Sequence, residues 1–123
     1  MSLLDIYCVT NKKVSFLNKK NINYKIGWVG KEQQESDYIF CKKKDNIFFK
    51  EKYYSELTFH YWYWKNILSL KNKNWIGFCQ KRRFWIKSES ENKEINQNNI
   101  QEHVLINPEK NWNNYEAIIC KPI

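Results

Sequence analysis

The chain has 123 residues, of which 42% are hydrophobic and 17% aromatic, so it is long enough for one domain that buries about two thirds of its unfolded surface. No apolar run reaches the roughly 18 residues of a membrane span, and the N-terminus lacks the regions of a signal peptide, which predicts a soluble, cytoplasmic protein. The net charge of +8 permits nucleic acid, an anionic membrane surface or phosphorylated small molecules as partners.

Two short apolar runs near the N-terminus predict buried strands. The first is Asp5–Thr10 (DIYCVT), and the second is Tyr24–Val29, which ends before a glycine. Between them, Val14–Asn23 fits either a short helix or an irregular crossover. The stretch Lys31–Lys44 mixes charges with a small apolar insert and has no clear assignment.

A central helix is predicted from Glu51 to Leu70, after a sharp turn at Asp45 and Asn46. Apolar residues recur at spacings of three and four and would share one face of this helix. They are Tyr54, Leu57, Tyr61, Trp64 and Leu68. Other aromatic residues cover most of the remaining circumference, so the helix is expected to be buried on more than one side.

After a turn at Asn72–Asn74, the run Trp75–Cys79 predicts another strand, which leads directly into Gln80, Lys81, Arg82 and Arg83. The order strand, helix, strand predicts an α/β fold with a mostly parallel sheet, in which ligands gather at the carboxyl ends of strands. These four polar residues are therefore expected at a ligand site.

The C-terminal part contains three further predicted segments. Lys87–Gln101 is strongly polar and is expected to be a loop or an exposed helix. Asn107-Pro108-Glu109 has the form of a helix start, and Tyr115–Cys120 (YEAIIC) predicts another buried strand.

The four cysteines are widely separated, without a C-x-x-C pair. Cys8, Cys79 and Cys120 lie inside apolar runs, where a reduced cysteine packs as a small hydrophobic residue. This spacing argues against a metal site and against a disulfide framework.

The adjacent pair Arg82 and Arg83 is the most informative feature, because these are the only arginines against 19 lysines. A guanidinium binds a carboxylate or a phosphate with two parallel hydrogen bonds, which an ammonium cannot do. Either the pair grips an anionic ligand, aided by Lys81 or Lys65, or one arginine pairs structurally with Glu56 while the other faces solvent.

Other candidate residues also have two interpretations. Glu56 is either a catalytic base or, as favoured here, a buried carboxylate that balances a cation. Asp45 and Asn46 either bind sugar hydroxyls or serve only as turn and cap residues. Trp62, Trp64 and His60 fit structural roles in the helix better than ligand contacts.

Two segments carry a resemblance to a known bacterial family. SELTFHYWYWKN at Ser55–Asn66 and WIGFCQKRRFW at Trp75–Trp85 are similar to the family patterns ELTxxYWxWKN and YIGLCHYRRYF. DIYCVTNKK resembles its first strand, often VVTHK, the turn DNIF resembles GDNIS, and YEAIICKPI resembles YDVILPKP. The family is a domain of unknown function whose members are predicted glycosyltransferases of capsule and lipopolysaccharide biosynthesis.

The chain departs from this family at several positions. Gln80 and Lys81 stand where the family has His-Tyr, Asn11 replaces a histidine, and Phe48 replaces a serine. Roles that depend on an imidazole are therefore in question at those positions. Family members are also longer, so the chain resembles only their N-terminal half.

The resemblance implies a GT-A-like, Rossmann-like α/β fold, incomplete in this chain, with residues 1–123 as one nucleotide-sugar-binding domain. It also implies transfer of a sugar from a UDP- or GDP-sugar donor to a polysaccharide or lipid-linked acceptor. This reaction is expected at the inner face of the cell membrane, and the chain is expected to act with a partner chain or a second copy. The residues expected in catalysis are Arg82, Arg83 and Glu56. Those expected at the donor are Thr10, Asn11, Lys12, Asp45, Asn46, Lys65, Gln80 and Lys81.

No D-x-D motif occurs, so no metal ligand is assigned and dependence on a divalent metal stays open. The acidic repeat Glu89-x-Glu91 lies in a polar stretch and is expected to be solvated.

Two other function classes compete with sugar transfer. One is a basic, aromatic module that stacks single-stranded nucleic acid, which is the weaker alternative because the lysines are scattered among asparagines. The other is a non-catalytic remnant, or a subunit of a split glycosyltransferase that needs a partner chain to complete its sheet.

Overall fold

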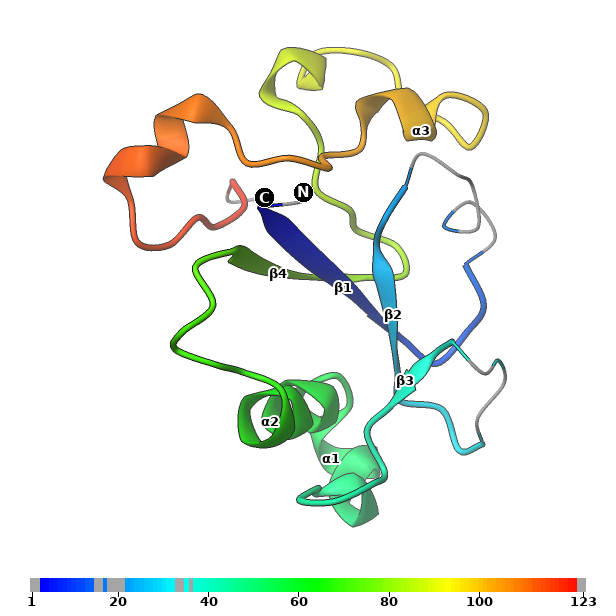
Figure 1. Cartoon of the computed structure of the whole chain (residues 1–123). Helices are drawn as coiled ribbons and strands as arrows, with labels where there is room; N and C mark the ends of the chain where they lie inside the picture. Colours follow the sequence, from blue (N-terminus) through cyan, green and yellow to red (C-terminus); the bar gives the residue numbers. More distant parts are fainter. Residues whose placement is uncertain (1–2, 15–16, 18–21, 33–34, 36, 122–123) are drawn as a thin grey trace.

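The chain forms a four-stranded, all-parallel sheet in the order β3-β2-β1-β4 (Figure 1). This computed structural model describes residues 3–14, 17, 22–32, 35 and 37–121. The strands are β1 (Leu4–Thr10), β2 (Lys25–Trp28), β3 (Ile39–Phe40) and β4 (Trp75–Gln80). The α/β, Rossmann-like fold expected from the sequence is confirmed, and β3 comes from the stretch that had no assignment.

Strand β1 is central to the sheet. It pairs on one side with β2, where Tyr7 lies opposite Lys25, and on the other with β4, where Leu4 lies opposite Trp75. Because the strands are parallel, their carboxyl ends lie along one edge of the sheet.

The side chains of β1 alternate between two hydrophobic cores. Leu4, Ile6 and Cys8 point to one face, and Tyr7 and Val9 point to the other. All five are buried. The sequence of β1 is almost continuously apolar because other parts of the chain cover the sheet on both faces.

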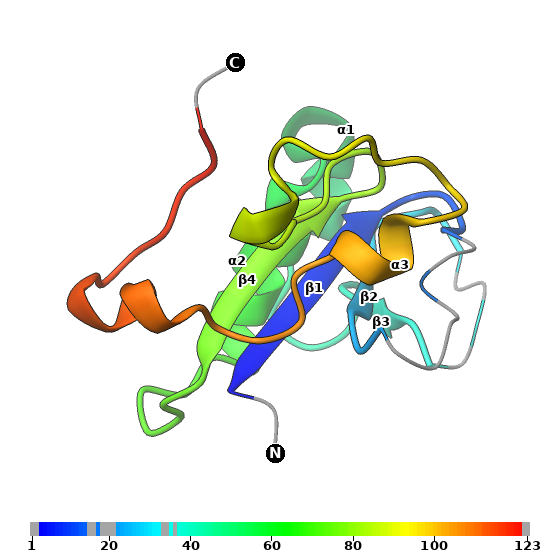
Figure 2. The same ribbon diagram turned by 90° about the horizontal axis from the view of Figure 1, so that it is seen from above.

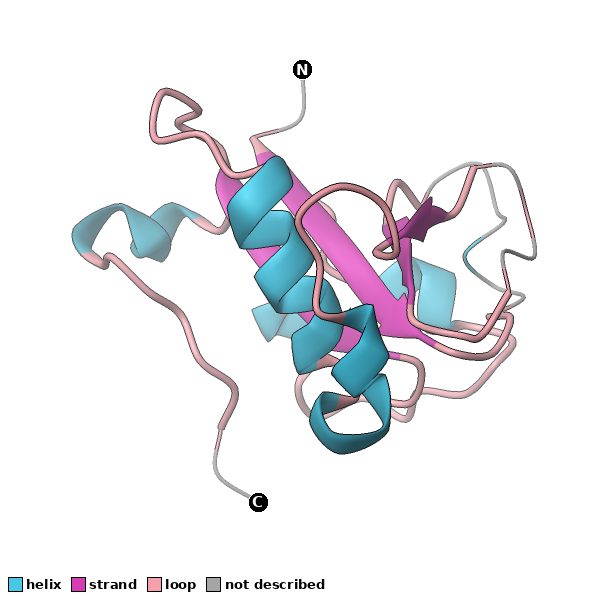
Figure 3. Ribbon diagram, turned by 90° about the horizontal axis from the view of Figure 1, so that it is seen from below, coloured by secondary structure: helices cyan, strands magenta, loops and turns pink. Residues whose placement is uncertain are grey.

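One face is covered by the helices that follow β3 (Figure 3). They are the 3-10 helix η2 (Phe48–Lys50), α1 (Glu51–Tyr54) and α2 (Leu57–Asn66). Phe59 of α2 is fully buried and packs against Tyr7, with ring centroids 5.9 Å apart. It also lies close to the backbone of β2, since a Cβ on Gly27 would be 2.7 Å from the ring of Phe59.

The other face is covered by the C-terminal part of the chain (Figure 2). This part contains η3 (Ser88–Ser90), α3 (Ile100–His103) and η4 (Lys110–Asn114). Val104, Leu105 and Trp112 are buried there, and the hydroxyl of Tyr24 donates a 2.6 Å hydrogen bond to the carbonyl of Leu105. The polar stretch Lys87–Gln101, predicted to be a loop or an exposed helix, is mostly loop.

The single helix predicted over Glu51–Leu70 is wrong in its extent. Ser55 interrupts it with φ 50° and ψ −120°, and α2 ends at Asn66, with Ile67 as its C-cap. A non-glycine residue at positive φ cannot continue a right-handed helix. The prediction that the helix is buried on several sides is also wrong: Trp62 is buried as expected, whereas Trp64 is exposed.

The strand predicted at Tyr115–Cys120 is also wrong, because this segment has no regular secondary structure and pairs with no strand of the sheet, although Ile118 packs against the core. Tyr115 is 61% exposed and Ile119 86% exposed. The helix predicted to start at Asn107 is instead the short η4, which begins at Lys110.

All four cysteines are free thiols. Cys8 and Cys79 are buried as predicted, but Cys120 is exposed, and Cys41 is buried in its place. Burial raises the pKa of the Cys41 thiol to about 12. Within the described ranges, no helix has the length and apolar character needed to cross a membrane.

The contrast between Phe59 and Leu57 allows a test of this packing. Phe59→Ala removes a fully buried ring and is expected to lower the free energy of unfolding by about 3–5 kcal/mol. Leu57→Ala alters an exposed side chain of the same helix and should change it by less than about 0.5 kcal/mol. Urea denaturation measures both values, and equal losses would contradict the packing of α2.

Candidate functional site

A polar pocket of about 320 Å³ lies at the carboxyl ends of the strands. It is lined by Val9, Thr10 and Asn11 after β1, Val29 after β2, Ser55 and Glu56 before α2, and Gln80, Lys81 and Arg82 after β4. The sheet order reverses between β1 and β4, because β2 and β3 extend to one side and β4 lies on the other. Open parallel sheets bind ligands at such a reversal point.

A tight turn after β4 carries the cationic side of this pocket. The N–H of Gln80 donates to the carbonyl of Arg83 at 3.2 Å, and the N–H of Arg83 donates to the carbonyl of Gln80 at 3.1 Å. Lys81 and Arg82 therefore occupy the tip of the turn. Arg82 is exposed, and within the described ranges its guanidinium makes no ion pair, so its donors remain available to a ligand.

The loop after β1 forms the floor of the pocket and is held in place by local hydrogen bonds. The hydroxyl of Thr10 accepts from the N–H of Lys12 at 3.0 Å and donates to the carbonyl of Lys12 at 2.7 Å. Asn11 extends from this loop, and its Oδ1 accepts a 2.8 Å hydrogen bond from Nζ of Lys81. This bond joins the loops after β1 and β4.

The start of α2 forms the third side of the pocket. The N–H of Ser55 donates to the carbonyl of Glu51 at 2.7 Å, and the carbonyl of Ser55 accepts from the N–H of Thr58 at 3.1 Å. The strained Ser55 backbone thus separates α1 from α2 and turns the N-terminus of a ten-residue helix toward the pocket. The positive end of the helix dipole favours an anion there.

Glu56 is the acidic group of the pocket and is half-buried. The structural alternative from the sequence was an ion pair between Glu56 and an arginine. In the part of the chain that the structure describes, neither arginine forms such a pair.

Six of the predicted site residues thus line one pocket: Thr10, Asn11, Glu56, Gln80, Lys81 and Arg82. The other five do not line it: Lys12, Asp45, Asn46, Lys65 and Arg83. Lys65 instead lies over the ring of Trp64, with its Nζ 3.9 Å from the centroid.

Asp45 belongs to a hydrogen-bonded clip that ties the loop before η2 to α2. Its carboxylate accepts a 2.9 Å bond from the hydroxyl of Tyr61, and its carbonyl accepts a 2.7 Å bond from Nδ2 of Asn66. The indole of Trp62 donates to the carbonyl of Lys43 at 2.7 Å. Asn46 stabilises the turn of the same loop, where its Oδ1 accepts a hydrogen bond from the N–H of Phe48 at 3.1 Å. These bonds match the turn role of Asp45 and Asn46 but not the cap role, because neither residue caps η2 or α1.

Sequence reasoning missed Ser55, Val9 and Val29 as parts of the pocket wall. The valines carry no polar signal. Ser55 could have been found from its type, because serine before an apolar helical run favours a new helix start, but the surrounding residues favoured one continuous helix.

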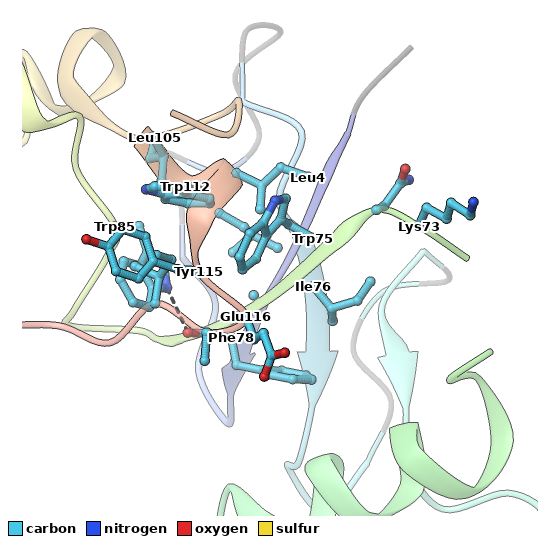
Figure 4. A pocket seen from close by; sticks show the side chains of 15 residues that line it. Leu4, Lys73, Trp75, Ile76, Phe78, Trp85, Leu105, Trp112, Tyr115 and Glu116 are labelled. Atoms are coloured by element: carbon cyan, nitrogen blue, oxygen red, sulfur yellow. Dashed lines mark hydrogen bonds between the residues drawn. The ribbon is translucent and has the colours of Figure 1, made fainter. Parts of the chain in front are cut away.

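A larger groove of about 560 Å³ lies beside β4, between the strand and residues 115–118 (Figure 4). Its lining is mostly apolar and includes Trp75, Trp85, Trp112 and Tyr115. The indole of Trp85 donates a 2.9 Å hydrogen bond to the carbonyl of Phe78 at the strand edge. Although this groove is larger, the smaller pocket has the strand-end position, the cationic turn and the helix N-terminus, and is therefore the candidate site.

No group of three or more His, Cys, Asp and Glu side chains that could hold a metal ion occurs among the described residues. Glu91, in the acidic repeat Glu89-x-Glu91, forms an ion pair with Lys121.

His60 lies one helical turn after Glu56 and packs on Phe78, with ring centroids 4.5 Å apart. Burial lowers the pKa of His60, and the charge of Glu56 partly opposes this effect. The neutral imidazole is therefore the form that the fold favours.

This lowered pKa predicts a pH dependence of stability. Between the folded pKa of His60 and the unfolded value of about 6.5, the unfolded chain binds more protons. The contribution of neutral His60 to the free energy of unfolding is therefore present above about pH 6.5 and is lost as the pH falls through the folded pKa. Between neutral pH and about pH 5, the melting temperature of the His60→Gln variant should therefore fall less than that of the wild type. Parallel thermal-melting profiles of the two proteins would contradict this.

The family model "Domain of unknown function (DUF4422)" matches residues 5–122, nearly the whole chain. No curated protein matches the chain, and no solved structure does either.

Proposed function

The chain belongs to the DUF4422 family, a domain of unknown function, and on this premise we propose that it is a glycosyltransferase domain whose pocket holds the diphosphate of a nucleotide-sugar donor. The observation that carries the proposal is the convergence of a cationic turn, a strand-end loop and a helix N-terminus on one pocket. Each of these features favours an anion, and parallel sheets bind nucleotides at this location.

The chemistry of sugar transfer matches the charges of the pocket. As an acceptor hydroxyl attacks the anomeric carbon, the bond to the nucleoside diphosphate breaks and negative charge grows on the departing phosphate. The guanidinium of Arg82 can donate two parallel hydrogen bonds to that phosphate, and Lys81 adds a second positive charge. Fixed donors of this kind stabilise the transition state without reorganising during the reaction.

Glu56 is the group in this pocket that suits the acceptor. Its carboxylate lines the same cavity as Arg82 and can take the proton that the acceptor hydroxyl loses as the new bond forms. The acceptor class is a saccharide or a lipid-linked saccharide, as the family resemblance suggests.

A second candidate is a donor-binding subunit that acts together with a partner chain. Within the described ranges β4 pairs only with β1, so its other edge borders the apolar groove. A sheet edge beside such a groove suits an added strand. Transferase activity of the isolated, monomeric chain would exclude this candidate.

Binding of UDP and GDP tests the donor site. A ligand at tenfold excess over its Kd stabilises the folded state by about 1.4 kcal/mol, so one of the two nucleotides at millimolar concentration should raise the melting temperature by a few degrees. Arg82→Lys should weaken this shift, because lysine keeps the charge but loses the planar fork.

The matched control is Arg83→Lys, which alters the neighbouring arginine outside the pocket lining and should keep the shift. The donor site is contradicted if neither nucleotide shifts the melt, or if both variants lose the shift equally.

A further inference from the structure

Helix α2 has a second apolar face that the fold leaves uncovered. Phe59 and Tyr63 are buried in the core between α2 and the sheet, whereas other residues of the helix and of the segment before it expose large apolar side chains. We call these exposed residues the outer face: Phe49, Tyr53, Tyr54, Leu57, Trp64 and Leu68. Phe49 is 74% exposed, Tyr53 73% and Trp64 57%. Exposed apolar surface of this extent marks an interaction site.

Lysines accompany the rings of the outer face. Nζ of Lys50 lies 5.5 Å from the ring centroid of Phe49, and Nζ of Lys52 lies 4.9 Å from that of Tyr53. Lys65 lies over Trp64. Lys50, Lys52 and Lys65 thus lie among the rings of this face, within a segment, residues 42–73, that contains eight lysines against three acidic residues.

This composition distinguishes between the possible occupants. Protein interfaces are enriched in aromatic residues but depleted in lysine, and two copies of the chain would bring their lysine clusters together. Segments that lie in a membrane interface combine Trp, Tyr, Phe and Leu with lysines, because the rings enter the headgroup region while the ammonium groups meet anionic lipids. Each lysine near an anionic leaflet adds to the attraction.

We propose that the outer face binds the surface of an anionic membrane, with helix α2 lying in the plane of the interface. The proposal does not depend on the proposed function. If both are correct, the pocket would lie near the lipid surface, because Ser55 and Glu56 at the start of α2 line it. A lipid-linked acceptor would then reach the pocket without leaving the bilayer.

Sedimentation with vesicles tests the proposal on the full chain. The protein should bind vesicles that mix phosphatidylcholine with phosphatidylglycerol, should bind far less to phosphatidylcholine alone, and should be released by salt. The triple variant K50E/K52E/K65E should lower binding by roughly tenfold or more, because the charge facing the lipids reverses. Its control, K31E/K93E/K110E, makes the same change in net charge at exposed lysines elsewhere and should lose much less.

The apolar contribution is tested separately with L57S/W64S, which should also weaken binding to the mixed vesicles. The control Y115S/I119S removes two exposed apolar side chains from a different segment and should bind like the wild type. The altered side chains are exposed in every variant, so melting temperatures near the wild-type value show that each one folds.

Equal losses in an outer-face variant and its control would overturn the proposal, as would an absence of binding to anionic vesicles. A dimer in solution that only the outer-face variants disrupt, without any binding to vesicles, would assign the face to a second copy and would also overturn it. None of these results depends on nucleotide binding, so they leave the test of the donor site separate.

Discussion

The close packing of Phe59 on β2 determines where the candidate site lies. Gly27 lacks a side chain at the point where the ring of Phe59 meets the strand, and any Cβ there would clash at 2.7 Å. Helix α2 can therefore approach the sheet closely, and Ser55 and Glu56, just before its first residue, reach the pocket at the carboxyl ends of β1 and β4. Without this contact, the helix N-terminus and the cationic turn would not share a pocket.

The family motifs divide into two physical roles in this structure. One part forms the clip, in which Asp45, Tyr61, Trp62 and Asn66 fix the loop before η2 to α2. The clip holds the helix in place and lies outside the pocket. The other part, the Ser55-Glu56 turn and residues 80–82, lines the pocket. A motif residue is thus not automatically a ligand residue, and the hydrogen-bond partners distinguish the two roles.

The sequence was sufficient for features that depend on local pattern and on the parallel sheet. Strands β1, β2 and β4 were predicted because their apolar runs are short and bounded by polar turns, whereas β3, with two residues, had no such pattern. Asn11, Lys81 and Arg82 were expected together because each follows a strand of a parallel sheet, and all three line the pocket. Three features failed because they depend on distant contacts or on the backbone. The break at Ser55 occurs at a residue that is not a strong helix breaker, and the apolar pattern of α2 does not indicate which of its sides packs on the sheet. The run Tyr115–Cys120 has the composition of a strand, but among the described residues it pairs with no strand of the sheet.

The central claim, that the strand-end pocket holds a diphosphate, is tested most directly by mapping amide chemical shifts in isotope-labelled protein during titration with a nucleoside diphosphate. The account predicts that the largest shifts fall on residues 9–11, 55–56 and 80–82, which line the pocket. Shifts concentrated instead on residues 73–78 and 112–118, along the aromatic groove beside β4, would contradict it, as would a titration that leaves the pocket amides unchanged.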